Sequence, residues 1–384
     1  MNICILTPRY PFPENGGDVL RINNVARYLK SKGHYLFLLS FIESNQKIVN
    51  EEYLYDEIIT VSRNKIESLF NSLLFIVQRK PIQCGYYYSR RFLKIFKDVI
   101  EEKDIDIYIP HLIRMVPYLE KTKLNDKTIV EMTDALSKTY TLSSQSKVKS
   151  IKKLIYNIEK KLVKAYEESI CKNFKKVVLV SEKDVEYLRN CNSNLYCFSN
   201  GVSLSKKIDK YNPNKICFIG NMRTLQNQDA VLHFVNNIFP IIKKENHDAY
   251  FVIVGAEPSE NILKLHDGKN IFVTGFVESV EDIIRDSCLA VAPVKIAAGI
   301  QNKVLIAMGC GVPVVLTSLI ANAIPELDNY INCCIEDNNK SFAEKCLKIM
   351  KESDFREMLA MNAYKMVEAN YSWKEKLNNY ELLE

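Results

Sequence analysis

The sequence lacks the features that would place it in a bilayer or in an oxidising compartment. No apolar run reaches the roughly 18 residues that a membrane span requires, and the first residues show neither a basic leader nor a cleavage site. The eleven cysteines show no paired CxxC spacing, which argues against a disulfide framework and against a zinc site. We therefore expect a cytosolic protein.

Two further absences exclude classes of nucleotide chemistry. After the first apolar run the chain reads PRYPFPENGGD at 8–18, with no GxGxxG and no acidic residue placed for a ribose. This argues against a dinucleotide-dependent dehydrogenase. No Asp-x-Asp cluster stands where it would hold a metal ion against a diphosphate. We expect no cofactor, no metal and no nucleic acid partner.

The basic residues are unevenly distributed. Residues 1–200 hold 32 Lys and Arg against 23 Asp and Glu, whereas residues 201–384 hold 20 against 23. The surplus is densest at 146–168, where lysines alternate with apolar residues at helical spacing. These lysines are Lys147, Lys149, Lys152, Lys153, Lys160, Lys161 and Lys164. Such a helix either rests on an anionic inner membrane surface or packs its apolar stripe on its own domain.

The front half alternates apolar runs with helical patterns. A run over 2–7 ends at Pro8, and a Pro/Gly loop then precedes a helical pattern from Val19 to Leu29. Further strands are predicted over 35–41, 106–109, 128–132 and 177–180. Repeated strand, helix, strand units predict a parallel, doubly wound α/β domain over 1–198.

The alternation restarts after the turn dipeptide Asn200-Gly201. Strands are predicted over 216–219, 250–254, 271–274, 289–294 and 312–316, followed by amphipathic helices from 341 onward. We predict a second parallel α/β domain over 199–370 and a tail, 371–384, that returns to the first. Ligands of doubly wound sheets bind at the carboxyl ends of the strands, so the cleft between two facing domains is the expected site.

Six segments carry a resemblance to a known family. They are PRYPFPENGGD at 8–18, EMTDALSKTY at 131–140, FIGNMRTLQNQDAVLHFVNNIFP at 218–240, FVIVGAEPS at 251–259, VTGFVESVEDI at 273–283 and APVKIAAGIQNKVLIAMGCGVPVVLTS at 292–318. As an ordered set they are similar to glycosyltransferase family 4, in its branch with a GIQNK-type donor loop. The resemblance implies the GT-B fold, in which two Rossmann-like domains face each other across a cleft, and transfer of a sugar from a nucleotide-sugar donor.

The chemistry of that reaction suits two helix starts of this chain. A departing diphosphate needs its negative charge stabilised, and the free N–H groups and dipole of a helix start favour an anion. Gly16 and Gly17 open the first helix, and the resemblance places them against the donor sugar and diphosphate. Lys303 stands in the first turn of a helix that the segment Gly299, Ile300, Gln301 and Asn302 begins. A cation there opposes the helix dipole unless an anion occupies that end.

The resemblance assigns further positions one at a time. His111, at the end of a predicted strand, resembles a histidine aimed at the donor sugar, although a satisfied or exposed histidine is the alternative. The phosphate-side turn corresponds to Asn221 and Arg223, and the segment that meets the nucleotide base corresponds to Gly275, Phe276 and Val277. We take Lys303, His111 and Gly17 as the catalytic candidates and the other named residues as donor-binding candidates.

One departure from the family pattern bears on activity. The family carries two glutamates in the donor loop, the second of which contacts the ribose hydroxyls, and here those positions are Ala298 and Ile306. An isoleucine cannot accept hydrogen bonds from a ribose. The donor-binding candidates therefore include Ile306 as a position where the family's ribose contact is missing.

The resemblance implies a retaining, metal-independent glycosyltransferase that acts on a glycan or a polyprenyl-linked acceptor in surface polysaccharide synthesis. A catalytically degenerate member that binds a glycan or a partner protein is the alternative that the missing glutamates favour. A nucleotide-sugar isomerase would need a cluster of acid and base carboxylates, and the sequence indicates none.

Overall fold

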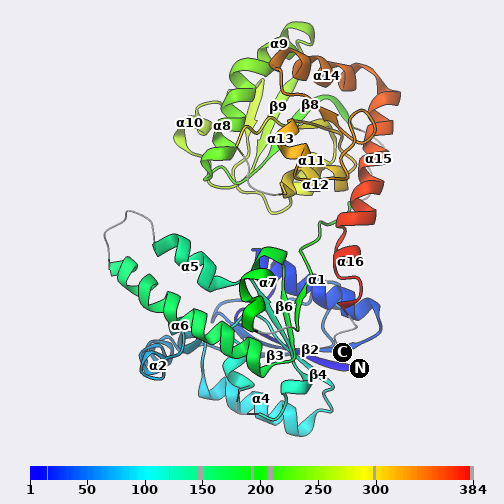
Figure 1. Ribbon diagram of the computed structural model, residues 1–384. Helices are drawn as coiled ribbons and strands as arrows, with labels where there is room; N and C mark the ends of the chain where they lie inside the picture. The colour runs from blue at the N-terminus through cyan, green and yellow to red at the C-terminus, as the bar shows by residue number, and fades with distance from the viewer. Residues whose placement is uncertain are drawn as a thin grey trace. The chain divides into compact units, whose positions relative to one another are not determined.

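The computed structural model describes residues 1–14, 16–120, 122–144, 151–191, 194–205, 211–296 and 300–380. The chain divides into two compact units, Met1–Asn200 with Leu377–Glu384, and Gly201–Lys376. Each unit has a hydrophobic core of its own. Figure 1 shows helices packed around a central sheet in each unit, as the predicted βα alternation requires.

The first unit contains seven strands and seven helices within the described residues. The strands are β1 Asn2–Thr7, β2 Tyr35–Ile42, β3 Glu57–Ser62, β4 Ile107–Pro110, β5 Ile129–Thr133, β6 Lys176–Leu179 and β7 Leu195–Cys197. The helices are α1 Gly17–Ser31, α2 Lys65–Val77, α3 Ile82–Tyr86, α4 Arg90–Glu102, α5 Leu136–Ser144, α6 Ile151–Asn173 and α7 Glu182–Leu188. The sequence pattern predicted neither β3 and β7 nor the helices α2, α3, α4, α5 and α7.

The strands of the first unit are parallel, and the order in which the chain adds them to the sheet reverses beside β1. Its strands run β3-β2-β1-β4 and β5-β6-β7, and the parallel bridges Tyr108–Thr128 and His111–Glu131 join the two sets. The chain therefore winds outward from β1 in one direction through β2 and β3, and then in the other from β4. A ligand crevice is expected where the order reverses, at the carboxyl ends of β1 and β4.

A buried ionic cluster joins three distant parts of this unit. The Arg21 Nε donates to Glu131 Oε1 at 3.1 Å, and both side chains are fully buried. The Tyr380 hydroxyl donates to the other oxygen of Glu131 at 2.7 Å. The cluster thus connects α1, β5 and the end of the described chain, and both oxygens of Glu131 have a partner, while the Arg21 Nη2 has none among the described residues.

The second unit is wound in the same way. Its strands are β8 Asn212–Ile219, β9 Tyr250–Val254, β10 Ile271–Val273, β11 Ser287–Ala292, β12 Val314–Leu316 and β13 Cys334–Ile335. The helices are α8 Leu225–His233, α9 Phe239–Glu245, α10 Glu260–Leu263, α11 Val280–Ile284, α12 Asn302–Gly309, α13 Ser318–Ala321, α14 Asn339–Lys351, α15 Ser353–Tyr371 and α16 Trp373–Lys376. The strand order β10-β9-β8-β11-β12-β13 places the reversal between β8 and β11.

Two findings concern disulfide cross-links and membrane-spanning helices. All eleven cysteines are free thiols, and nine of them are buried, so they serve as core residues rather than as cross-links. Among the described residues, no helix combines the length and the apolar character that crossing a membrane requires.

Candidate active site

The carboxyl ends of β8 and β11 bring two helix starts together in the second unit. β8 and β11 pair in parallel, so the loops that follow them emerge at the same edge of the sheet. The first loop leads into α8 and the second into α12. Gln226 of α8 donates to Gln301, the N-cap residue of α12, with 3.3 Å between the side-chain nitrogen and oxygen.

Lys303 lies at the centre of this meeting point. Its ammonium nitrogen donates to Asn227 Oδ1 and stands 5.0 Å from the centre of the Phe218 ring. Asn227 is itself held in place, because its side-chain nitrogen donates to the carbonyl of Asn221 at 2.8 Å. The end of β8, the following turn and the first turn of α8 therefore position a cation that belongs to α12.

The Lys303 ammonium has an unusual electrostatic environment. Across the described ranges, no carboxylate lies within ion-pair distance of it, and partial burial lowers the pKa of Lys303 to about 8. Burial disfavours the charged form of an amine unless an opposite charge compensates. An anion at this position would supply that compensation, and the start of α12 would favour the same anion.

The other candidates of the second unit lie along the same sheet edge. Asn221 and Arg223 are exposed in the turn after β8, where Arg223 pairs with Glu257 at 3.7 Å. Gly275 follows β10 with a φ of 69°, a left-handed conformation that glycine adopts without strain. Phe276 beside it is 66% exposed and Val277 is half-buried. β10 is separated from β8 by β9, so these three residues are farther from Lys303 in the sheet than Asn221.

The helix start itself differs in detail from the prediction. α12 begins at Asn302 with Gln301 as its N-cap, so Ile300 precedes the helix and is 49% exposed. Ile306 is half-buried and packs against the core of the second unit. Gly299 and Ala298 lie outside the described residues.

Sequence reasoning missed the residues that position Lys303. Asn227, Phe218 and Gln226 belong to the segment 218–240, of which only the turn was predicted to meet the donor. The available signal was Asn227, an amide in the first turn of a predicted helix. Such a side chain is as often a solvent-facing residue, and only the pairing of β8 with β11 brings it to Lys303.

The loop that contains Gly16 and Gly17 follows β1, where the strand order of the first unit reverses. Gly16 caps α1 with a φ of 117°, a value that favours glycine. A Cβ at Gly16 would lie 2.5 Å from a guanidinium nitrogen of Arg9, whereas a Cβ at Gly17 would meet nothing within 4 Å. Arg9 is held across the loop by an ion pair with Asp18 in the first turn of α1. The start of α1 is thus open beside Gly17.

His111 follows β4 at the same reversal point. Its side chain is buried, and neither ring nitrogen has a hydrogen-bond partner among the described residues. Burial lowers the pKa of His111 to about 3, while the nearby Asp18 carboxylate acts in the opposite direction. The histidine is therefore neutral at physiological pH. It is neither satisfied nor exposed, in contrast to the two alternatives that the sequence left open.

A buried histidine that resists protonation makes stability depend on pH. The unfolded chain binds a proton near the ordinary pKa of 6.5, whereas the folded chain does so only near 3. Stability is therefore lost as the pH falls between these values. From pH 7.5 to pH 5 we expect the wild type to lose about 2 kcal/mol more than His111→Gln. Urea unfolding at both pH values measures the difference, and equal losses would contradict the assignment.

The difference between the wild type and His111→Gln also cancels the effect of a second titrating group. Burial raises the pKa of Glu167 to about 7, so its contribution to stability decreases as the pH rises through this range and opposes that of His111. Glu167 is present in both proteins and cancels in the difference.

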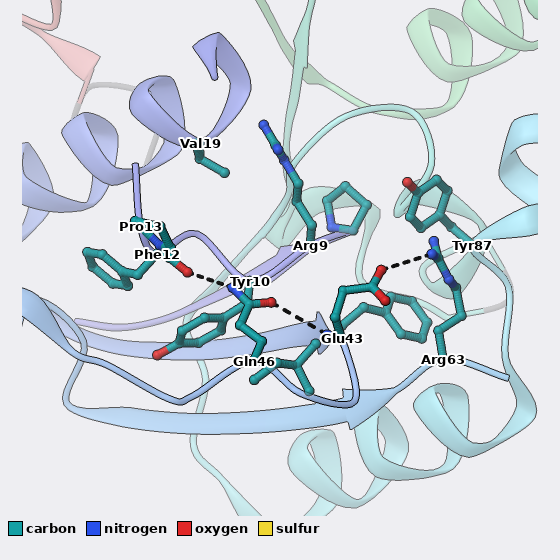
Figure 2. Close-up of a pocket in the computed structure, with 12 residues that line it drawn as sticks. Arg9, Tyr10, Phe12, Pro13, Val19, Glu43, Gln46, Arg63 and Tyr87 are labelled. Atoms are coloured by element: carbon teal, nitrogen blue, oxygen red, sulfur yellow. Dashed lines mark hydrogen bonds and ion pairs between the residues drawn. The ribbon is translucent and has the colours of Figure 1, made fainter. Parts of the chain in front are cut away.

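A cavity of about 310 Å³ lies beside the glycine loop. It is formed by residues that follow β1, β2 and β3, and Figure 2 shows Arg63 against Tyr87 on one wall and Tyr10, Phe12 and Pro13 on the other. The Arg63 guanidinium pairs with Glu43 at 3.2 Å and lies 5.0 Å from the centre of the Tyr87 ring. Aromatic faces next to fixed polar groups suit a sugar ring, which has apolar faces and hydroxyl edges.

The acidic residues do not form a metal site in the part of the chain that the structure describes. No group of three His, Cys, Asp or Glu side chains with metal-binding geometry occurs there. The pair Asp104 and Asp106 precedes β4, and Asp106 accepts the backbone N–H of Asn2 at 2.8 Å. These two carboxylates therefore lie at the amino edge of the sheet, away from the loops described above.

Comparisons with known proteins bear on the family and the fold. Residues 213–352 match the family model described as Glycosyl transferases group 1. The chain is 23% identical over 402 residues to an uncharacterized 44.6 kDa protein in the cps region of Klebsiella pneumoniae, with 97% of each chain covered.

Solved structures extend the likeness to both units. A glycosyltransferase from Rickettsia africae ESF-5 is 17% identical, with a TM-score of 0.54 and 100% and 98% of the two chains covered. Anabaena Alr3699/HepE in complex with UDP-glucose is 12% identical, with a TM-score of 0.58 and 100% and 99% covered. The prediction of the GT-B fold is confirmed.

Proposed function

We propose that this chain, a glycosyltransferase of the GT-B fold, transfers a sugar from a nucleotide sugar to a glycan or lipid-linked acceptor in surface polysaccharide synthesis. The observation that carries the proposal is the Lys303 ammonium, held at the start of α12 without a carboxylate partner among the described residues. The UDP-glucose complex of Anabaena HepE and the Klebsiella cps-region relative support the donor and the pathway class.

The donor diphosphate would occupy the starts of α12 and α8. Lys303 and the free N–H groups of these helices would stabilise the charge that develops as the bond from the anomeric carbon to the diphosphate oxygen breaks. The acceptor hydroxyl would bond to the same carbon from the same face and give its proton to the departing diphosphate. We infer that this retaining transfer uses Lys303 and helix dipoles, with no metal requirement.

The first unit would supply the remaining contacts. We assign Gly17 and the neutral His111 to the donor sugar, since a histidine ring with two unpartnered nitrogens can donate to one hydroxyl and accept from another. The cavity lined by Arg63 and Tyr87 would receive the acceptor. Its aromatic walls and fixed charges are compatible with a sugar of the growing glycan.

A donor screen tests the proposal. The purified protein would be incubated with a panel of nucleotide sugars while hydrolysis and thermal stabilisation are measured. Stabilisation with one nucleotide sugar and slow hydrolysis of the same compound would support a transferase. If no donor stabilises the protein and none is hydrolysed, the result would contradict the proposal. It would favour the alternative, a degenerate member that binds a glycan, which the apolar Ile306 supports.

Ile306 offers a separate test of how the donor is held. We expect Ile306→Glu to lower the Kd of the nucleotide sugar several-fold, because a carboxylate one turn after Lys303 can accept hydrogen bonds from ribose hydroxyls. Isothermal titration with the donor and with the free nucleotide measures the change.

The control is Ile306→Leu, which keeps the side-chain volume and should leave the Kd unchanged. Loss of the folded state in Ile306→Glu alone would mean that position 306 belongs to the core. Ile306→Gln, which is uncharged, would then test the ribose contact.

A further inference from the structure

Helix α2 exposes an apolar stripe along its whole length. Each of its exposed apolar residues has another three or four positions away, as one face of a helix requires. They are Ile66 (81% exposed), Leu69 (65%), Phe70 (64%), Leu73 (59%), Leu74 (39%) and Val77 (81%). So many large apolar side chains on one contiguous helix face indicate a surface that another body covers.

The opposite face of α2 explains why the stripe points outward. Its buried residues are Ser68, Asn71 and Ser72, which are small and polar, and Phe75 near the end of the helix. The helix lies so close to α3 that a Cβ at Gly85 would be 2.5 Å from the backbone oxygen of Asn71. Asn71 also donates its side-chain N–H to the carbonyl of Tyr88 at 2.8 Å. Leucine or phenylalanine side chains at positions 71 and 72 would not fit this close contact, so the middle of the helix keeps its large apolar residues on the outside.

The segment around the stripe is strongly basic. Between residues 63 and 97 there are eight Lys and Arg and a single acidic residue, Glu67. Glu67 is already used, since it accepts hydrogen bonds from the Ser89 hydroxyl and the Arg90 backbone N–H. Six of the cations are exposed, namely Lys65, Arg79, Arg90, Arg91, Lys94 and Lys97. The net positive charge of the segment is therefore presented to solvent.

We propose that α2 is an interfacial helix that seats the first unit on an anionic lipid surface. Its apolar stripe would enter the boundary between head groups and acyl chains, while the basic residues of the segment would face the lipid phosphates. Figure 1 shows α2 at the outer margin of the first unit. A second copy of the chain fits this surface less well, because a symmetric contact would bring two basic segments together.

This surface differs from the lysine-rich segment that the sequence indicated. α6 buries Val163, Tyr166 and Ile170 in the core of the first unit, whereas Ile158 on the same helix is 38% exposed. Lys147 and Lys149 lie outside the described residues. Lys161 and Lys164 are exposed on α6, but the described part of that helix presents no apolar stripe comparable with that of α2. Lipid contact by the lysine-rich segment stays a prediction, and the exposed stripe of α2 carries the present proposal.

Vesicle co-sedimentation of the full chain tests the assignment. The vesicles contain phosphatidylcholine alone or phosphatidylcholine with 30% phosphatidylglycerol. Wild-type protein should bind the anionic vesicles more tightly, and 0.5 M salt should weaken the binding. Leu69→Gln with Leu73→Gln should weaken the binding at least about tenfold, because the transfer of two leucine side chains from water into the lipid is lost. Arg90→Gln with Arg91→Gln should weaken it roughly fivefold for each cation removed.

Matched variants separate this surface from general effects. Leu263 and Met361 are each 50% exposed and lie in the second unit, so Leu263→Gln with Met361→Gln should bind vesicles like the wild type. Wild-type binding by the Leu69/Leu73 variant, or equal binding to neutral and anionic vesicles, would overturn the proposal. So would a wild-type dimer that the Leu69/Leu73 variant converts to a monomer, because the occupant would then be a second copy.

A fluorescence measurement locates the helix in the bilayer. Phe70→Trp places an indole on the stripe, while Trp373 is buried and serves as a constant background. The emission of Phe70→Trp should shift to shorter wavelength on vesicle binding and be quenched by lipids brominated on the acyl chains. Binding without quenching would contradict insertion of the stripe. Donor hydrolysis without vesicles is measured on each variant, so failure of this inference is distinguishable from failure of the proposed transferase activity.

Discussion

Lys303→Ala is expected to lower kcat by roughly a hundredfold or more while changing KM far less. The Lys303 ammonium and the start of α12 would act on the same diphosphate, and the negative charge on that group increases as the sugar leaves. Steady-state kinetics with the donor that the screen identifies measures both constants. Parental turnover in a folded Lys303→Ala protein would remove Lys303 from the mechanism and leave the helix starts as the source of stabilisation.

The pH dependence distinguishes a charge effect from a structural one. Burial lowers the pKa of Lys303 to about 8, so the free enzyme loses this cation as the pH rises through 8, and donor affinity should decrease there. Lys303→Arg should recover only part of the rate, since the guanidinium is larger and forked, but its affinity should not fall over this range because it stays charged. Lys264→Ala, which removes an exposed lysine of the second unit, is the matched control and should behave like the wild type.

Glu131→Gln is expected to lower the free energy of unfolding by about 3–5 kcal/mol. The substitution leaves the fully buried Arg21 guanidinium without its opposite charge, and an uncompensated buried charge is among the most destabilising changes in a protein core. Differential scanning calorimetry should show a decrease in Tm of about 10 °C. Tyr380→Phe, which removes only the hydroxyl that donates to Glu131, should cost about 1 kcal/mol.

A double variant tests whether the charge is the cause. Arg21→Met with Glu131→Leu removes both ions and keeps apolar volume, so it should be more stable than Glu131→Gln alone. If the double variant were as unstable as Glu131→Gln, the loss would come from packing or from the Tyr380 hydrogen bond. Neither variant changes Lys303, so donor binding by the folded protein serves as a check that the second unit is intact.

The arrangement of helices and strands was largely accessible from the sequence. Apolar runs separated by helical patterns predicted the strands β1, β2, β4, β5 and β6 and all the longer strands of the second unit. The positions of His111 and Lys303 at strand and helix ends followed from the same pattern, because parallel strands direct their carboxyl ends to one edge. The start of α12 was placed a few residues too early, since the glycine before it resembles a helix start.

The helix α2 shows why other features were not accessible. Its sequence, KIESLFNSLLFIV, is amphipathic, but periodicity alone does not indicate which face meets the core. An apolar stripe ordinarily packs inward, whereas here the close approach of α3 selects the face with Ser68, Asn71 and Ser72. That contact depends on the path of the chain after the helix, which a local pattern does not contain.

The sequence by itself determined the α/β class and the residues available at the strand ends, because the periods of helix and strand are set by local backbone geometry. The tertiary structure alone decided the partners of those residues. Asn227 and Lys303 are 76 positions apart and meet because β8 pairs with β11. The same holds for the buried Arg21–Glu131 pair and for the His111 ring, which has no hydrogen-bond partner in the part of the chain that the structure describes. Burial, and with it charge state, follows from long-range packing that removes water from particular groups.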